Sequence, residues 1–193
     1  RGRTMIGWDE ILEGGLAANA AVMSWRSMKG GYEAAILDHE AVMSPTSHCY
    51  FDYDVKRIPM EKTYAFCPIP EGLPEEKARF ILGGQANMWT HIARTDSAID
   101  RQIFPRLLAL AEALWSEAEQ KQFTDFYHRY ESHEQRLRRL GVAVGPAAEP
   151  PLLKPKMDSL AHRLSWRPNA RPSHRQPLLL VNTATAQPLA HAN

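Results

Sequence analysis

Four short apolar runs in the first half of the chain alternate with segments of helical or irregular character. The runs occupy residues 4–8, 20–25, 41–44 and 81–89. Each is typical of a buried strand. Residues 28–38 have helical composition, and residues 74–80 predict a short helix with proline at its first position. This alternation predicts an α/β fold of parallel strand-helix units, covered on the outside by amphipathic helices. Four such strands make half of an eight-stranded barrel.

Two helices are predicted after the last strand. Ser97 and Asp100 resemble a capping box, and apolar residues then repeat at helical spacing through Trp115. Pro105 fits only near the first turn of that helix. A last helix is expected to end at Gly141. Its apolar face consists of Phe123, Phe126, Tyr127, Tyr130, Leu137 and Leu140.

Two segments lack any periodicity. Residues 46–72 are rich in proline, aromatic and polar residues, which is long for a plain connection and indicates a functional loop. Beyond Gly145 the composition changes to Pro, Ala, Arg and His. We therefore expect one domain over residues 1–145 and a mostly disordered, low-complexity tail over residues 146–193.

Charge and hydropathy exclude several classes of partner. The 193-residue chain has 23 basic and 22 acidic residues, so its net charge of +1 favours neither nucleic acid nor an anionic membrane. No apolar run approaches the roughly 20 residues that span a bilayer, and the start of the chain has no signal-peptide core. Because the chain has no initiator Met, we expect its true beginning to be missing, and nothing follows about secretion.

The cysteines and histidines do not form a metal-site pattern. Cys49 and Cys67 are free thiols in the simplest interpretation. A disulfide is the alternative if the protein is exported, since both flank one irregular segment. Four histidines without metal-ligand spacing are most simply surface residues: His39, His48, His128 and His133. We expect neither a metal nor a cofactor.

Five segments in a particular order carry a family pattern. They read Gly7-Trp8-Asp9-Glu10-Ile11-Leu12, Ser24-Trp25-Arg26, Tyr50-Phe51-Asp52, Gly83-Gly84-Gln85-Ala86-Asn87-Met88-Trp89, and Phe104 through Trp115. Together they make residues 3–145 similar to family 20 glycoside hydrolases, the β-N-acetylhexosaminidases. The resemblance implies the C-terminal half of a TIM barrel, about strands 5 to 8, with the site at the carboxyl ends of the strands.

The family that the chain resembles removes terminal N-acetylglucosamine or N-acetylgalactosamine with retention, and the substrate's own acetamido oxygen is the nucleophile. The protein must supply an apolar box for the acetamido group, a carboxylate that orients its N–H, and a general acid. The resemblance makes Trp8, Trp25 and Trp89 walls of that box. It gives Tyr50 the catalytic role of donating its hydroxyl to the acetamido carbonyl, and Asp52 the binding of sugar hydroxyls. For any single tryptophan, core packing is the competing interpretation.

Asp9 and Glu10 resemble the family's catalytic Asp-Glu pair, but they lack the His-X-Gly-Gly signature that precedes it. Adjacent residues of a regular strand also point to opposite faces, so both could not enter the site. We interpret them as helix-capping or supporting residues, and we expect the catalytic pair upstream of Arg1. The 193-residue chain alone should therefore be inactive.

Two positions depart from the family pattern. His91 stands where the family usually has a Glu that accepts hydrogen bonds from sugar hydroxyls. A neutral imidazole accepts only one such bond, so we expect weaker or altered reading of the hydroxyl at the fourth carbon. Tyr64 or Phe66 is the candidate for an additional aromatic residue that the family carries in the long loop.

The resemblance implies a glycan with a terminal N-acetylhexosamine as the partner. It makes a periplasmic or secreted location plausible, although the sequence itself leaves the location, the linkage and the oligomeric state unknown. Two other functions stay open. One is a noncatalytic carbohydrate-binding relative or an inactive truncated product, and the other is a structural module with its tryptophans buried away from any cleft.

Overall fold

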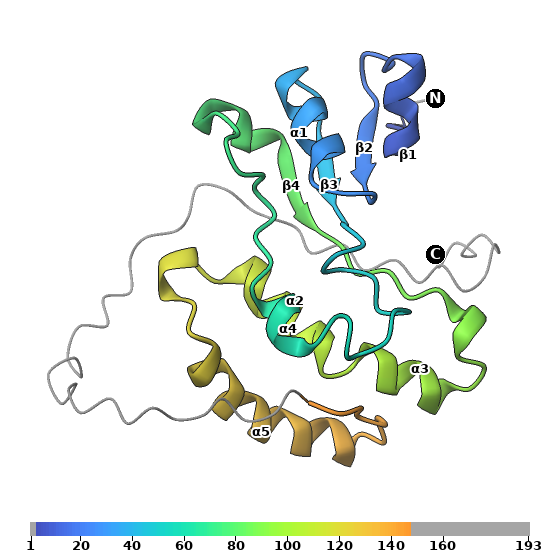
Figure 1. The fold of residues 1–193 in the computed structure, drawn as a ribbon, viewed down its shortest axis with the longest axis vertical. Helices are drawn as coiled ribbons and strands as arrows, with labels where there is room; N and C mark the ends of the chain where they lie inside the picture. The colour runs from blue at the N-terminus through green and yellow to red at the C-terminus, as the bar shows by residue number, and fades with distance from the viewer. Residues whose placement is uncertain (1–2, 148–193) are drawn as a thin grey trace, which may run out of the picture.

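A computed structural model describes residues 3–147 of the chain, and its strands form a four-stranded sheet in the upper half of the view in Figure 1. The strands are β1 (Ile6–Trp8), β2 (Ala21–Ser24), β3 (Ala41–Met43) and β4 (Ile81–Gly84). They lie in chain order, and each neighbouring pair is parallel. The predicted parallel α/β sheet is thus confirmed, although β4 ends well before Trp89. The predicted tail lies almost entirely outside the described residues.

Helices pack around the sheet. The α-helices are α1 (Lys29–Ile36), α2 (Met60–Tyr64), α3 (Asp96–Ile103), α4 (Arg106–Trp115) and α5 (Phe123–Arg139). Short 3-10 helices are η1 (Asp9–Gly14), η2 (Glu75–Phe80), η3 (Thr90–Ile92) and η4 (Ala118–Gln120). α1 packs against β2 and β3, whereas α4 contacts both α2 and α5 (Figure 1). The helix predicted over residues 74–80 is therefore present, but as the 3-10 helix η2.

The helix predicted from Ser97 to Trp115 is divided in two. α3 and α4 meet at Phe104 and Pro105, which a cis peptide bond joins. Proline has no N–H for an interior helical hydrogen bond, so α4 begins anew directly after it. The predicted capping box was also wrong. The cap of α3 is Thr95, whose side chain accepts a hydrogen bond from the backbone N–H of residue 98.

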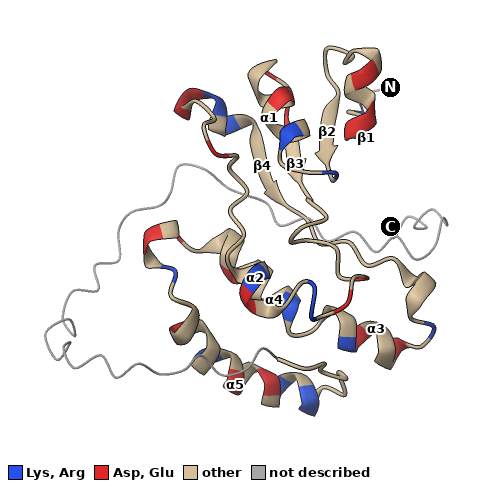
Figure 2. Cartoon of the chain, viewed as in Figure 1, with Lys and Arg blue, Asp and Glu red and all other residues tan. Residues whose placement is uncertain are grey.

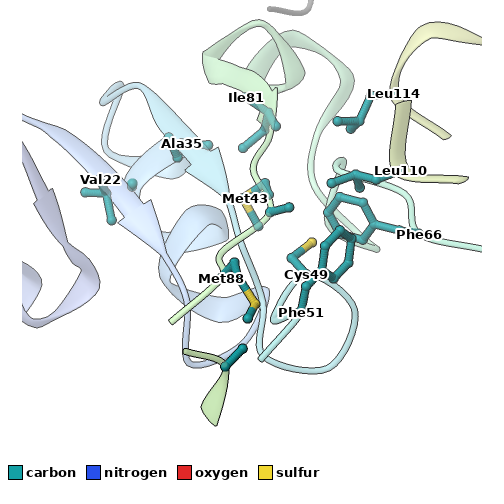
Figure 3. Packing of buried hydrophobic residues seen from close by; sticks show 14 residues of the cluster. Val22, Ala35, Met43, Cys49, Phe51, Phe66, Ile81, Met88, Leu110 and Leu114 are labelled. Atoms are coloured by element: carbon teal, nitrogen blue, oxygen red, sulfur yellow. The ribbon is translucent and has the colours of Figure 1, made fainter. Parts of the chain in front are cut away.

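The main core lies between the sheet, α1 and α4 (Figure 3). It includes Val22, Ala35, Met43, Cys49, Phe51, Phe66, Ile81, Met88, Leu110 and Leu114. Two glycines allow close packing in this region. A Cβ atom at Gly31 would overlap Met43 Sδ, and one at Gly84 would lie only 2.9 Å from a methyl group of Leu114. A larger residue at Gly31 would push α1 away from β3, and one at Gly84 would push α4 away from β4.

A second core cluster joins α2, α4 and α5. It consists of Met60, Tyr64, Ala109, Phe126, Tyr127 and Tyr130. The predicted apolar face of α5 is thus confirmed over its first half, but Leu140 was wrongly included. Leu140 is 79% exposed, because it lies beyond the last helical residue. Gly141 follows with a φ of 82°, which suits the predicted helix stop.

Both cysteines are free thiols. Cys49 is buried in the main core and Cys67 is exposed. Burial raises the pKa of the Cys49 thiol well above its ordinary range, so this side chain stays protonated and unreactive at neutral pH. Among the residues that the structure describes, no helix is long and apolar enough to cross a membrane.

Candidate functional site

Four aromatic side chains form a continuous line at the carboxyl ends of the strands. The ring centroids of Trp8 and Trp89 are 6.3 Å apart, those of Trp8 and Trp25 are 6.4 Å apart, and those of Trp25 and Tyr50 are 6.1 Å apart. Trp8 and Trp25 meet edge to face, at an interplanar angle of 82°. We call Trp8, Trp25, Tyr50 and Trp89 the aromatic group. The structure thus brings together the four residues that the sequence placed at strand ends.

The sheet topology explains how residues so distant in sequence meet. Trp8 is the last residue of β1, and Trp25 directly follows β2. Beyond β3 and β4 the chain forms one more parallel bridge, between Tyr50 and Asn87, which brings Tyr50 and Trp89 to the same edge. The three tryptophans are half-buried, so part of each indole ring faces solvent. This partial exposure argues against simple core packing.

Tyr50 is a neutral hydroxyl donor. Its side chain is almost fully buried, and this burial raises the pKa of the phenol well above its usual range. The nearby Asp52 carboxylate raises the pKa further, because a second negative charge is disfavoured there. The phenol therefore keeps its proton at neutral pH and can donate a hydrogen bond to an acceptor on a ligand.

Asp52 lies two residues beyond Tyr50 and is only 8% exposed. Burial raises the pKa of its carboxyl group, and the charges of His91 and Arg106 oppose this effect in part. Its Oδ1 atom has no hydrogen-bond partner within the described part of the chain. A buried acceptor of this kind is rarely left unpaired, so Asp52 has the capacity to accept a further donor such as a hydroxyl group.

A buried network of polar side chains supports the aromatic group from beneath. Asn87 Nδ2 donates to Ser44 Oγ at 2.6 Å, and Gln85 Nε2 donates to Asn87 Oδ1 at 2.7 Å. Ser44 Oγ in turn donates to the Gln85 carbonyl at 3.0 Å. These bonds join the ends of β3 and β4, where the regular ladder stops. They fix the backbone that carries Tyr50 and Trp89, and sequence reasoning did not assign them this role.

Arg106 anchors the long loop that follows Tyr50. Its side chain is 2% exposed and lies over the Phe51 ring. The guanidinium group donates to the carbonyl oxygens of Phe51, Tyr53 and Ile58 in the loop, and to that of Gln102 at the end of α3. One side chain therefore ties several backbone acceptors of the loop to the start of α4. Sequence reasoning missed this residue, because nothing in a helical pattern marks an arginine as buried.

Asp9 supports the segment that carries Trp25. Its carboxylate accepts hydrogen bonds from the backbone N–H groups of Trp25 and Arg26, at 3.2 and 3.3 Å, and from Arg26 Nε at 2.7 Å. Gly30 leaves room for it, since a Cβ atom there would lie 2.8 Å from Asp9 Cβ. Asp9 and Glu10 belong to η1 and not to a regular strand, and no side-chain cap bond is present at its N-cap. The supporting role agrees with the contacts, whereas the capping role does not.

The histidines differ in exposure. His91 is exposed on η3, close enough to Asp52 for its charge to lower the pKa of that carboxyl group. His128 and His133 are exposed, as predicted. His39 and His48 are only partly exposed, and His39 Nδ1 lies 2.9 Å from the Ala20 carbonyl oxygen.

The structure does not support either candidate for an additional aromatic residue in the loop. Tyr64 is buried against Phe126 in the second core cluster, and Phe66 belongs to the main core. Tyr53 is instead the loop aromatic that reaches the site, with its ring centroid 5.8 Å from that of Tyr50. Its position three residues after Tyr50 was the available sequence signal.

Two hollows of the surface lie away from the aromatic group. One hollow of about 260 Å³ lies between α4 and α5, and another of about 410 Å³ lies beside Asp9, Arg26 and Glu33. Neither is lined by a member of the aromatic group. The half-buried aromatic residues and the unpaired Asp52 oxygen instead have the chemistry of ligand recognition. Within residues 3–147, no cluster of His, Cys, Asp and Glu side chains has the composition of a metal site.

The sequence of the chain is similar to those of known proteins. Residues 1–118 match the family model for the catalytic domain of glycosyl hydrolase family 20. A β-hexosaminidase of Porphyromonas gingivalis is 42% identical over 153 residues, which are 73% of this chain and 20% of that protein. A β-N-acetylhexosaminidase of Cellulomonas fimi is 27% identical over 157 residues, which are 72% of this chain and 31% of that protein.

The fold of the chain is also similar to those of solved structures. The chain resembles a chitobiase of Flavobacterium johnsoniae with a TM-score of 0.64 and 33% identity, over 73% of this chain and 22% of that one. It resembles a family 20 exo-β-N-acetylglucosaminidase of Vibrio harveyi, solved with N-acetylglucosamine, with a TM-score of 0.68 and 28% identity, over 75% of this chain and 25% of that one. The chain spans a fifth to a third of the length of the two curated relatives described above. Since the family model covers more than half of the chain, the chain belongs to glycosyl hydrolase family 20, with residues 1–118 in its catalytic domain.

Proposed function

We propose that this chain forms the C-terminal half, about strands 5 to 8, of the catalytic barrel of a retaining exo-β-N-acetylhexosaminidase. Residues 1–145 belong to the barrel in this proposal. The substrate is a glycan or chitooligosaccharide with a terminal N-acetylglucosamine or N-acetylgalactosamine. The observation that carries the proposal is the aromatic group at the strand ends, with buried Asp52 beside it.

The proposed reaction uses the substrate's acetamido oxygen as the nucleophile. Trp8, Trp25 and Trp89 wall the acetamido group and hold it beneath the anomeric carbon, where proximity favours attack. Tyr50 donates a hydrogen bond to the acetamido carbonyl oxygen, which attacks the anomeric carbon while the general acid protonates the leaving oxygen and the bond to it breaks. Water then attacks the anomeric carbon of the oxazolinium-like intermediate and regenerates the acetamido group. The high pKa of Tyr50 suits this role, because the phenol stays a donor throughout.

Asp52 and His91 bind the sugar hydroxyls in this proposal. The unpaired, buried Oδ1 atom of Asp52 accepts one of them. His91 accepts at most one more, so the hydroxyl at the fourth carbon is held less firmly than by a carboxylate. We therefore expect less discrimination between the gluco and galacto configurations at that carbon than in an enzyme with Glu at this position.

The general acid and its partner Asp are proposed to lie upstream of Arg1. Asp9 and Glu10 are not candidates for this pair, because both carboxylates already accept hydrogen bonds from the Trp25-Arg26 segment. Within the sheet that residues 3–147 form, β1 and β4 each have a neighbouring strand on one side only. Unpaired strand edges favour association, so the isolated chain should be poorly stable or prone to associate.

The test is release of nitrophenol from 4-nitrophenyl N-acetyl-β-glucosaminide and from its galacto epimer. The 193-residue chain and the full-length product of its gene are compared under the same conditions. We expect activity in the full-length protein only. Turnover by the 193-residue chain would contradict the position of the catalytic pair and reopen the assignment of Asp9 and Glu10.

The second candidate function is noncatalytic carbohydrate binding, and the exposed His91 in place of a carboxylate favours it. Binding of N-acetylglucosamine by the full-length protein, measured by calorimetry, without hydrolysis of either nitrophenyl substrate would support this function and refute the enzyme.

A further inference from the structure

Trp25 is held by two carboxylates from the short helix η1. Asp9 binds its backbone N–H, as described above, and Glu10 binds its side chain. Both oxygens of the Glu10 carboxylate lie close to the indole Nε1 of Trp25, at 3.1 Å and 3.0 Å. In Figure 2, η1 carries acidic segments that follow directly after β1. Backbone and ring of one tryptophan are therefore fixed by two adjacent residues of the neighbouring strand-helix unit.

The position of Trp25 makes this contact important for the site. Its ring lies between Trp8 and Tyr50, so it touches both the first tryptophan and the hydroxyl donor of the aromatic group. The ring is only half-buried, so packing alone does not restrict its rotation completely. A bond from the indole N–H to the exposed Glu10 carboxylate favours one of the two orientations that the last side-chain torsion of Trp25 allows.

Glu10 remains ionised under neutral conditions. The hydrogen bond from Trp25 is the main factor that lowers the pKa of Glu10, and the charge of Arg26 lowers it further. A hydrogen bond to an ionised acceptor is stronger than one between neutral groups. The indole N–H is thereby committed to Glu10, and the ring presents its apolar surface elsewhere.

We propose that Glu10 is a positioning residue that sets the orientation of Trp25 and thereby the width of the acetamido box. This inference rests on the proposed hexosaminidase function. Glu10 does not touch the reacting atoms in this scheme. Glu10 affects the selectivity for the acyl group, because a Trp25 ring that is free to rotate makes the acetamido box wider.

Acyl selectivity provides a readout that is independent of the amount of folded enzyme. The full-length protein is assayed with 4-nitrophenyl N-acetyl-β-glucosaminide and with its N-propanoyl analogue, which adds one methylene to the acyl group. A close-fitting apolar pocket discriminates between such a pair by about tenfold or more. Each variant is described by the ratio of its kcat/KM values for the two substrates.

Glu10→Leu removes both acceptor oxygens. We expect its kcat/KM for the N-acetyl substrate to fall about tenfold, the effect of losing one charge-assisted hydrogen bond. We expect its N-propanoyl to N-acetyl ratio to rise about fivefold as the pocket widens. Glu10→Gln keeps one acceptor oxygen without the charge, so it should restore most of the N-acetyl activity and shift the ratio only about twofold.

Glu13→Gln is the matched control. Glu13 lies on the same short helix and is exposed, and it binds Arg26 without any contact to Trp25. Its substitution removes the same charge and should leave the ratio at the wild-type value. Melting temperatures of all variants separate a general loss of stability from the change in selectivity.

The outcomes separate this inference from the proposed function. Wild-type protein that hydrolyses neither substrate refutes the hexosaminidase, and the positioning role falls with it. Active wild-type protein with unchanged ratios in Glu10→Leu and Glu10→Gln leaves the enzyme standing and overturns the role of Glu10. If Glu10→Leu does not fold, a wild-type ratio in Glu10→Gln overturns it. A shifted ratio in Glu13→Gln also overturns it, since the effect would then follow from charge and not from the contact.

Discussion

Replacement of Arg106 by methionine should destabilise the protein by about 3 kcal/mol. Methionine fills much of the same volume but donates no hydrogen bonds, so the loop carbonyls of Phe51, Tyr53 and Ile58 lose a buried donor. Each buried acceptor left unpaired costs about 1 kcal/mol or more. Relief from burying the charge reduces the total, and we therefore expect the low end of that range.

The effect should also reach the site. Burial lowers the pKa of Arg106 to about 10, so the guanidinium group is still charged at neutral pH and its hydrogen bonds are charge-assisted. Without them the loop that carries Asp52 and Tyr53 loses its connection to α4. We expect weaker binding of N-acetylglucosamine in addition to the loss of stability. Arg106→Lys should recover little, because a single ammonium group cannot match the planar fork of five donors.

Urea denaturation of the full-length protein measures the free energy of unfolding, and calorimetry measures binding of N-acetylglucosamine. Arg101→Met is the matched control, since Arg101 is an exposed arginine of α3 whose guanidinium group donates to the Ser97 hydroxyl. That change should alter stability by less than about 0.5 kcal/mol. An Arg106→Met protein within about 1 kcal/mol of wild type, with unchanged affinity, would refute the anchoring role.

Three further predictions concern single residues of the site and core. Tyr50→Phe should lower kcat about 100-fold with little change in KM, since it removes one donor to the developing charge and keeps the ring; a change below about threefold in steady-state kinetics contradicts the catalytic role. His91→Glu should lower KM for the gluco substrate about threefold or more and change the gluco to galacto ratio, because a carboxylate accepts two hydroxyl donors; unchanged kinetics would remove His91 from the site. Iodoacetamide should label Cys67 rapidly and Cys49 only after unfolding, since Cys49 is buried with a raised pKa; peptide mapping by mass spectrometry would contradict this if both react together.

The strands were predictable because their sequence signal is local. The runs at β2 and β3 are short and buried on both faces, as parallel strands covered by helices require. The first run was wrongly predicted to be buried, because β1 lies at the edge of the sheet and Ile6 is 46% exposed. The position of the aromatic group could be predicted from the strand ends, since the last residue of a parallel strand and the residue after it lie at the carboxyl edge of the sheet. Trp8 and Trp25 fit that rule directly. Trp89 lies well beyond β4 and met the others only through the Tyr50–Asn87 bridge.

The polar supports of the site could not be predicted, because each depends on a contact between distant segments. Ser44 and Asn87 are adjacent only in the folded sheet, and Arg106 reaches backwards along the chain to Phe51. The identity of a residue alone does not show whether an arginine at the start of a helix is buried or exposed. The sequence also did not show that Thr95, and not Ser97, caps α3, because the cap depends on the extended backbone that Thr95 adopts.

Two of these supports follow a common arrangement, in which an aromatic residue beyond a strand end is held by a residue from a neighbouring segment. Trp25 after β2 is held by Glu10 after β1, and the bridge to Asn87 after β4 holds Tyr50 after β3. The apolar rings supply the contact surface for a ligand, but half-buried rings have little to restrain them. Directional hydrogen bonds restrain these rings and occupy little space. Substitution of a support should therefore change how closely the site fits its ligand before it changes whether the protein folds, and Arg106, which supports both the loop and the core, should be the exception.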